Sequence, residues 1–255
     1  MTGSGPERAA PILLGLLVLA LWQGAVWGFA VPDYLLPGPA AIAGAFFAAP
    51  RLLLTGLVST LAVTFAALIA ACVLGVAMAL LMELSRLARA AIAPWAVVLQ
   101  VTPIVAIAPL IIVLVGNPFA SLVVCATIVA FFPVFANTTA GLGAVPAELL
   151  DLFRLYGASR GQTLWLLRLP AALPYFLAGL RISGGLALVG AVVAEFVAGS
   201  GGFASGLAYR ILEAGYRLEI PRMFAALVLL ALAGIAINWS LGAFGAALLR
   251  RRGEG

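Results

Sequence analysis

Runs of about 20 mainly apolar residues recur along this chain, and no other feature of the sequence constrains its fold as strongly. An α-helix needs a run of that length to cross a hydrocarbon core of about 30 Å. Charged residues make up 9% of the chain, whereas a soluble domain carries roughly 25%. Because lipid offers the backbone no water to bond, each run must be a helix. The sequence therefore predicts an all-α membrane protein, a polytopic helical bundle.

Six runs can be placed, at about residues 11–30, 56–82, 91–115, 119–136, 171–199 and 223–249. Orientation follows from the 14 basic residues, which are all arginine. With the N-terminus in the cytoplasm, ten of them fall on the inner side: Arg8, Arg86, Arg89, Arg154, Arg160, Arg168, Arg181, Arg250, Arg251 and Arg252. Arginine is normally enriched on cytoplasmic loops, so we predict about six transmembrane helices with both termini inside (N-in, C-in).

The first run can also be read as a secretory signal sequence, because Arg8 precedes it and it ends in Gly28-Phe29-Ala30. Its about 20 residues exceed the apolar core of a typical signal peptide. We therefore interpret residues 1–10 as a cytoplasmic tail and residues 11–30 as a retained first transmembrane helix.

The residue inventory argues against several functions. The chain has no His, so imidazole metal sites and His-based acid–base catalysis are excluded. The net charge of +5 is spread between the apolar runs instead of forming a stripe, which does not indicate nucleic-acid binding. Cys72 and Cys125 lie inside apolar runs and are interpreted as small hydrophobic residues. No phosphate-binding Gly-x-x-x-x-Gly-Lys loop occurs, so the chain is not expected to hydrolyse ATP.

The inner segment between the fourth and fifth runs, residues 137–170, is long and polar, and long loops are usually functional. Pro146 and the acid at Glu148 indicate a helix start. An apolar face follows at helical spacing, at Leu149, Leu152, Phe153 and Tyr156. Gly157 interrupts this helix, and a second apolar patch follows at residues 164–167. The segment predicts a helix–turn–helix hairpin whose apolar side meets a partner or, alternatively, rests at the lipid interface.

The spacing in this segment resembles the cytoplasmic coupling loop of permease subunits of bacterial ABC importers. The family pattern is Glu-Ala-Ala, three residues, Gly, nine residues, Ile, any residue, Leu-Pro. Here nine residues separate Gly157 from Leu167-Arg168-Leu169-Pro170, and the triplet falls on Asp151-Leu152-Phe153, with only the acidic character kept. The resemblance implies a coupling helix within about residues 146–170, with the coupling residues Asp151, Phe153, Arg154, Tyr156, Gly157, Ala158, Ser159, Leu167, Leu169 and Pro170.

Each part of the loop has an expected task. Phe153 and Tyr156 are expected to be buried in a groove of the ATPase. Gly157 is expected where a side chain would clash in a sharp turn, and Leu169-Pro170 where the chain returns to the membrane. Arg154 and Arg160 are each expected either to pair with acidic residues of the ATPase or to be solvated.

Residues 55–250 resemble the permease core of one subgroup, which transports nitrate, sulfonates, taurine and thiamin-precursor pyrimidines. The run from Thr102 to Leu110 is similar to its Pro-x-x-Ala-x-x-Pro-Leu motif, and Ala194-Glu195-Phe196-Val197 is also similar. The Gly-Leu-Gly expected downstream reads Gly201-Gly202-Phe203.

The resemblance implies partners and a location. Two copies form the pore in the bacterial inner membrane, a separate ABC ATPase binds ATP and Mg, and a periplasmic or lipid-anchored protein delivers the solute. This chain itself is expected to hold no cofactor and no metal. The substrate stays open between a thiamin-precursor pyrimidine, a riboflavin-like compound, nitrate, a sulfonate and taurine. Because no Lys or His lies in the runs and Arg181 lies at the inner edge of its run, no strong anion site is visible, and a neutral heteroaromatic solute is slightly favoured.

Five residues are candidates for the translocation pathway: Gln100, Thr102, Pro103, Pro109 and Glu195. The two prolines interrupt the backbone hydrogen bonds of the third run, as either a packing kink or part of a water-filled path. Glu195 is the one acid within an apolar run, about 21 Å beyond Arg181. It is expected to act in the pathway as a gating or structural residue, to make a structural contact, or to be exposed at the outer interface. An ion-coupled secondary transporter that uses Glu195 as its carrier is the main alternative, and a membrane-embedded enzyme is disfavoured because no acids pair within the spans.

Overall fold

The computed structural model describes residues 5–199 and 205–252, and side chains from residue 9 onward within them. In this described part the chain is helical and contains no strand. The elements are α1 (Gly5–Gly28), α2 (Pro39–Ala48), α3 (Pro50–Leu84), α4 (Arg86–Val101), α5 (Ile104–Val115), α6 (Pro118–Gly143), α7 (Ala147–Leu155), α8 (Arg160–Thr163), the π-helical turn η1 (Leu164–Arg168), α9 (Leu169–Ala198), α10 (Leu207–Tyr216) and α11 (Ile220–Arg251).

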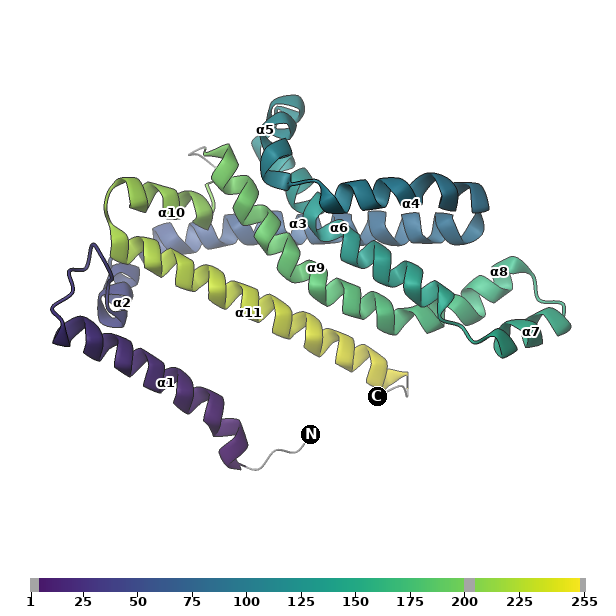
Figure 1. The fold of residues 1–255 in the computed structure, drawn as a ribbon, viewed down its shortest axis with the longest axis horizontal. Helices are drawn as coiled ribbons and strands as arrows, with labels where there is room; N and C mark the ends of the chain where they lie inside the picture. The colour runs from purple at the N-terminus through teal and green to yellow at the C-terminus, as the bar shows by residue number, and fades with distance from the viewer. Residues whose placement is uncertain (1–4, 200–204, 253–255) are drawn as a thin grey trace.

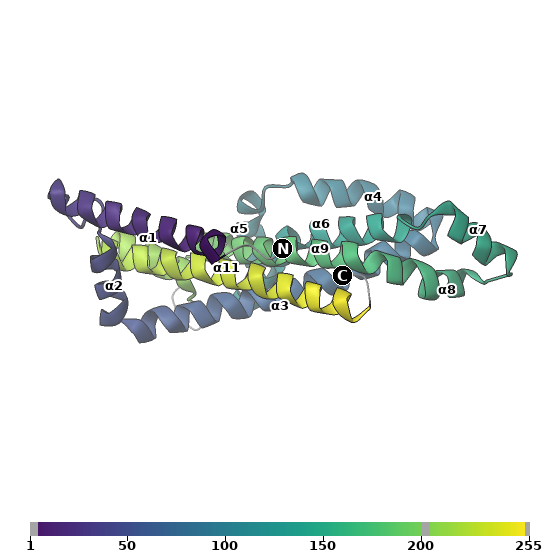
Figure 2. The same ribbon diagram turned by 90° about the horizontal axis from the view of Figure 1, so that it is seen from below.

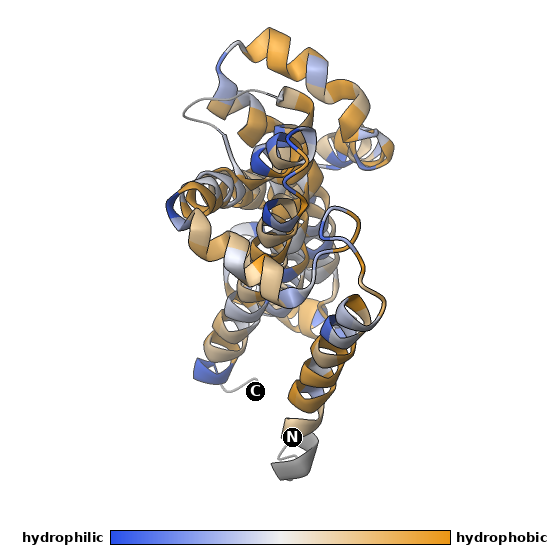
Figure 3. Cartoon of the chain, turned by 90° about the vertical axis from the view of Figure 1, so that its left-hand side faces the viewer, coloured by the Kyte–Doolittle hydropathy of each residue, from blue (hydrophilic) through white to orange (hydrophobic). Residues whose placement is uncertain are grey.

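The long helices run side by side, and α9 lies at the centre, against α3, α5, α6, α10 and α11 (Figure 1). Many large hydrophobic side chains are exposed along these helices, and hydrophobic residues colour much of the cartoon in Figure 3. Five described segments are long and apolar enough to cross a membrane, and α4 with α5 would make a sixth. The predicted helical membrane bundle is therefore confirmed.

The two ends of the bundle differ. The α7–α8 hairpin projects beyond the other helices at one end, while α2 and α10 lie at the opposite end (Figures 1 and 2). The C-terminal end of α11 points in the same direction as the hairpin (Figure 1). This is the arrangement that an N-in, C-in topology requires.

The predicted third span, residues 91–115, is wrong as a single helix. α4 and α5 meet at an angle of 105°. The break lies at Thr102, whose ψ of 121° is extended, because a residue before proline is forced out of the helical region. Pro103 then precedes α5, whereas Pro109 lies within α5 without ending it. Only one of the two prolines therefore separates two helices.

Helix α2 was not predicted. Its ten residues are too few to cross a membrane, and because all of them are apolar, they do not show the alternation of apolar and polar residues that indicates a helix. The predicted tail of residues 1–10 falls partly outside the described residues, and α1 begins at Gly5. The Gly201-Gly202-Phe203 stretch lies outside them altogether.

The interface of α6 with α9 depends on glycines that let the two backbones approach. A Cβ added at Gly179 would lie 2.6 Å from the carbonyl oxygen of Pro133, and one at Gly190 would lie 2.9 Å from Cα of Ala126. Close contact between small residues is the usual basis of helix association in lipid.

We expect Gly179→Ala to destabilise the folded protein, although alanine is the better helix former by about 1 kcal/mol. The added methyl group would meet rigid backbone, and overpacking of this kind costs about 1–3 kcal/mol. Gly185→Ala is the matched control, because it lies on the same helix and its Cβ would meet nothing within 4 Å. The midpoint of thermal unfolding in detergent should fall for Gly179→Ala only; equal midpoints would contradict this packing.

Candidate functional site

The inner hairpin, defined as residues 147–168, begins with helix α7 where the sequence predicted a start. Pro146 occupies its N-cap position, and Glu148 lies in its first turn. Near its end Asp151 and Arg154 form an exposed ion pair of 2.8 Å across one turn. Both side chains are free to exchange this contact for one with a partner, because an exposed pair contributes little stability.

The turn between α7 and α8 requires glycine for its backbone conformation. Gly157 has a φ of +69°, which costs an L-residue about 1–2 kcal/mol. Two backbone hydrogen bonds close the turn, from Gly157 N–H to the oxygen of Arg154 (3.0 Å) and from Ala158 N–H to that of Phe153 (2.9 Å). A Cβ on Gly157 would meet nothing within 4 Å. The requirement for glycine therefore comes from the backbone of the turn itself, where a Cβ would crowd the local carbonyl oxygen, and not from a neighbouring element.

Helix α8 begins with a capping box that the sequence analysis overlooked. The Ser159 hydroxyl accepts a hydrogen bond from Gln162 N–H (3.2 Å), and the Gln162 side chain accepts one from Ser159 N–H (2.8 Å). The Ser-x-x-Gln spacing was the available signal. Capping gives α8 a defined direction directly after the glycine turn.

The hairpin continues into the membrane without a break. Arg160 to Ala198 form one continuous helical segment, which begins before Leu169-Pro170 and runs past Pro174 without a break. The π-helical turn, which contains Leu167, comes directly before Leu169 and Pro170. A wider turn at this point accommodates a proline that has no N–H to donate. Movement of the hairpin is thereby joined directly to α9.

Large apolar side chains are exposed on the hairpin. Leu155 is 83% exposed, Tyr156 82% and Trp165 71%, while Phe153 is partly buried within the chain itself. Tyr156 thus lies where a partner can cover it, as predicted, and Leu155 is an additional exposed residue that the periodicity did not single out.

A cluster of charged groups, called here the Arg168 cluster, holds the base of the hairpin. The Arg168 guanidinium contacts the Glu83 carboxylate and donates to the carbonyl oxygen of Leu142 (3.3 Å). Glu83 also pairs with Arg89 at 3.1 Å. The Arg168 and Glu83 side chains are only 24% and 16% exposed. The hairpin is therefore tied to the corner between α3 and α4, which no sequence motif indicated because the partners lie 85 residues apart.

Glu195 is buried at the other end of α9, with 2% exposure. Its carboxylate accepts hydrogen bonds from the Thr60 hydroxyl (2.8 Å) and from Ala208 N–H (3.0 Å), while Thr60 Oγ1 accepts one from Leu207 N–H (2.9 Å). A Cβ on Gly206 would overlap this carboxylate. Glu195 thus caps the N-terminus of α10 and joins α3, α9 and α10.

The other pathway candidates lie apart from Glu195. Gln100 is exposed near the end of α4, and the Thr102 hydroxyl donates to the carbonyl oxygen of Val98 (2.6 Å). Pro103 directly precedes α5 and Pro109 lies within it; Ala108 of α5 lies in the same buried cluster as Ala194. None of these four residues hydrogen-bonds Glu195 in the described structure, so the structure does not gather the five candidates into one site.

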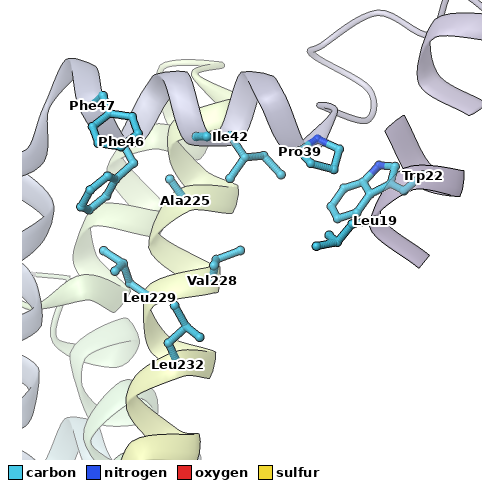
Figure 4. Close-up of a pocket in the computed structure, with 11 residues that line it drawn as sticks. Leu19, Trp22, Pro39, Ile42, Phe46, Phe47, Ala225, Val228, Leu229 and Leu232 are labelled. Carbon is cyan, nitrogen blue, oxygen red and sulfur yellow. The ribbon is translucent and has the colours of Figure 1, made fainter. Parts of the chain in front are cut away.

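A hydrophobic cavity of about 370 Å³ lies between α1, α2 and α11. Figure 4 shows Trp22, Ile42 and Phe46 around it, with Leu229 on α11. Its walls are hydrocarbon except for the indole N–H of Trp22, which has no partner among the described residues. Such a lining suits an acyl chain better than a polar solute.

The resemblance to importer permeases implies that Glu195→Gln should lower uptake while an ATPase stays bound, because the change weakens the capping of α10 at the end opposite the hairpin. Loss of a charged acceptor typically costs about 1.5–3 kcal/mol. Asp33→Asn, an exposed outer residue, is the control for the lost charge. Vesicle uptake and co-purification should be measured together; unchanged uptake would leave Glu195 a purely structural role.

Comparison with known proteins places these features in context. Residues 71–253 match the family described as "Binding-protein-dependent transport system inner membrane component". A probable ABC transporter permease protein of Haemophilus influenzae is 35% identical, covering 91% of this chain and 93% of the relative. The riboflavin transport system permease protein of Chloroflexus aurantiacus is 34% identical, covering 89% of this chain and 84% of the relative. The formylaminopyrimidine transport permease protein of Halalkalibacterium halodurans is 33% identical, covering 90% of each chain.

Solved structures share the fold. A methionine ABC transporter in an inward-facing conformation gives a TM-score of 0.66 at 23% identity, covering 77% of this chain and 96% of the other. An amino acid ABC transporter gives 0.64 at 20% identity, with 79% and 96% covered. At these identities the likeness concerns the fold alone.

Proposed function

The chain belongs to the family of binding-protein-dependent transport system inner membrane components, and we propose that it forms the solute pathway of an ATP-driven importer and couples to its ATPase through the inner hairpin. It is a multi-pass protein of the bacterial inner membrane. The family is a transport permease family and not a catalytic one, so ATP hydrolysis and the binding of ATP and Mg are assigned to a partner subunit.

The observation that carries this proposal is the projecting hairpin. Its exposed Leu155, Tyr156 and Trp165 would be costly to leave in water, because each large side chain is worth about 1.5–3 kcal/mol when buried. The capping box and the glycine turn give the hairpin a defined shape. A rigid, apolar projection of this kind suits a groove on a partner protein. The alternative, a hairpin resting in the lipid interface, would leave the projection beyond the bundle unexplained.

Coupling would proceed through rigid elements. The hairpin is continuous with α9 and is held to the α3–α4 corner by the Arg168 cluster. A pull on the hairpin is therefore passed to two membrane helices at once. We propose that two copies form the pore, and that closure of two ATPase subunits rocks them as rigid bodies between inward- and outward-open states.

The outer end would receive the solute-binding protein. α2 and α10 lie at that end (Figure 1), and Glu195 holds α10 in place. We assign Glu195 to this outer region of the pathway, and Gln100, Thr102, Pro103 and Pro109 to a separate part of it at the bend between α4 and α5. Relatives are named for riboflavin, formylaminopyrimidine, aliphatic sulfonates and taurine, and all of these stay candidate solutes.

A pull-down tests the proposed class. Tagged protein is extracted in mild detergent from its native membrane, and co-purifying chains are identified by mass spectrometry. We expect an ATPase with a phosphate-binding loop in near-equal amount. Recovery of the chain alone, even after gentle crosslinking of the membranes, would overturn the proposal in favour of an ion-coupled transporter that uses Glu195.

A further inference from the structure

Arg181 lies well inside helix α9 and not at the inner edge that its charge alone suggested. Helix α9 extends inward to Leu169, so Arg181 lies 12 residues, or about 18 Å, from that end. To Ala198 at the outer end the distance is 17 residues, or about 25 Å. Arg181 is therefore not at the inner end of its helix.

Helix α11 gives an independent measure of depth. Asn238, which contacts Arg181, is 12 residues from Arg250. The apolar stretch 223–249 is about 40 Å long, about 10 Å longer than a hydrocarbon core. Even if all of that excess lies at the inner end, Asn238 remains about 7 Å inside the core. The two side chains thus meet within the hydrocarbon region.

The contacts of Arg181 orient it without neutralising it. Its Nε donates to Asn238 Oδ1 at 2.8 Å. A Cβ on Gly242, one turn further along α11, would lie 3.5 Å from its Cζ, so glycine leaves room for the guanidinium. Among the described residues Arg181 pairs with no carboxylate, and its two terminal nitrogens donate no hydrogen bond. The Arg181 side chain is exposed in a single copy of the protein.

An arginine facing lipid at such a position costs at least about 2.5–3.5 kcal/mol. Intramembrane charges accordingly face a bundle interior or a water-filled cavity. The exposed stripe of α9 that includes Ala178, Ile182 and Val189 runs beside Arg181 on a helix that otherwise packs on all sides against protein. This stripe is where a second copy or a water-filled path would lie.

We propose that Arg181, oriented by Asn238, binds an anionic oxygen of the transported solute in the inner half of the pathway. This rests on the proposed function and narrows its substrate class to solutes that carry a sulfonate, carboxylate or phosphate. The two unpaired terminal nitrogens can hold such a group in a bidentate arrangement. The initial preference for a neutral heteroaromatic solute, which assumed Arg181 at the inner edge, is thereby reversed.

The test uses the intact permease–ATPase complex and two probes of similar shape, methanesulfonate and uncharged methanesulfonamide. The shift in thermal unfolding midpoint over a concentration series gives an apparent affinity, because a ligand that binds the folded state stabilises it. We expect methanesulfonate, but not methanesulfonamide, to raise the unfolding midpoint of the wild-type complex. Its affinity should be at least about tenfold weaker in Arg181→Gln and unchanged in Arg250→Gln, an exposed arginine at the inner end of α11.

Other outcomes are equally informative. Equal shifts by both probes, or a methanesulfonate shift that persists in Arg181→Gln, would overturn the proposal. Co-purified lipids are measured in parallel: anionic lipid lost only in Arg181→Gln, with no effect of methanesulfonate, would mean that Arg181 holds a lipid phosphate instead. Arg181→Lys, which keeps the charge, guards against misfolding and should retain part of the shift. If wild-type protein recovers no ATPase, the proposed function fails separately from this site.

Discussion

Replacing Gly157 with Leu is expected to abolish ATP-driven uptake while the membrane helices stay folded. The backbone at Gly157 has a positive φ, and a leucine there would be strained by about 1–2 kcal/mol. The turn would relax to another conformation and change the angle between α7 and α8. The hairpin would then no longer fit its partner. Vesicle uptake and the amount of co-purifying ATPase measure the effect.

The control for this change is Gly161→Leu. Gly161 lies in α8 with ordinary helical backbone, and a Cβ there would meet only the Ser159 hydroxyl, at 3.9 Å. It adds the same apolar side chain to an exposed site of the same hairpin. Normal uptake together with normal ATPase recovery in Gly157→Leu would refute the coupling role of the hairpin.

Reversing the charge of Arg168 is expected to reduce uptake roughly tenfold or more, a loss that corresponds to about 1.4 kcal/mol. The variant Arg168→Glu places a second carboxylate beside Glu83, and Glu83→Arg places three guanidinium groups together. Either change should separate the base of the hairpin from the α3–α4 corner. The ATPase should still bind, because the exposed hairpin surface is unaltered. ATP would therefore be hydrolysed without transport.

A charge exchange decides whether the pair itself matters. The double variant Glu83→Arg/Arg168→Glu should recover a substantial part of the uptake lost in each single variant. Arg86→Glu, a reversal at an exposed residue of the same corner, should have little effect. Uptake that is normal in the single variants, or no better in the double variant, would show that the Arg168 cluster does not transmit motion.

Hydrophobic runs were sufficient to predict the membrane helices because lipid leaves the backbone few alternatives. They could not predict the bend at Thr102, since proline is common in membrane helices and only packing decides whether a helix kinks or ends. They also missed α2, which has the composition of a span but half its length. Arg181 was assigned to the inner edge because of its charge, although the predicted run 171–199 already began ten residues before it.

The hairpin was predictable from local spacing, since its helix start, its glycine turn and its exposed tyrosine all lie within one short segment. The contacts that hold it were not. Glu83 reaches Arg168 across 85 residues, and Thr60 reaches Glu195 across 135. Such pairs depend on how helices distant in the sequence are packed, and a single sequence carries no signal of that packing.

Site-specific photocrosslinking tests most directly whether the inner hairpin is where the ATPase docks. A photoreactive amino acid is placed at Tyr156, which is 82% exposed on the hairpin, or at Tyr216, which is 87% exposed on α10 at the opposite end. Illumination of native membranes should link the ATPase to position 156 and not to position 216. An ATPase captured from position 216, or lipid alone captured from position 156, would contradict docking of the ATPase on the inner hairpin.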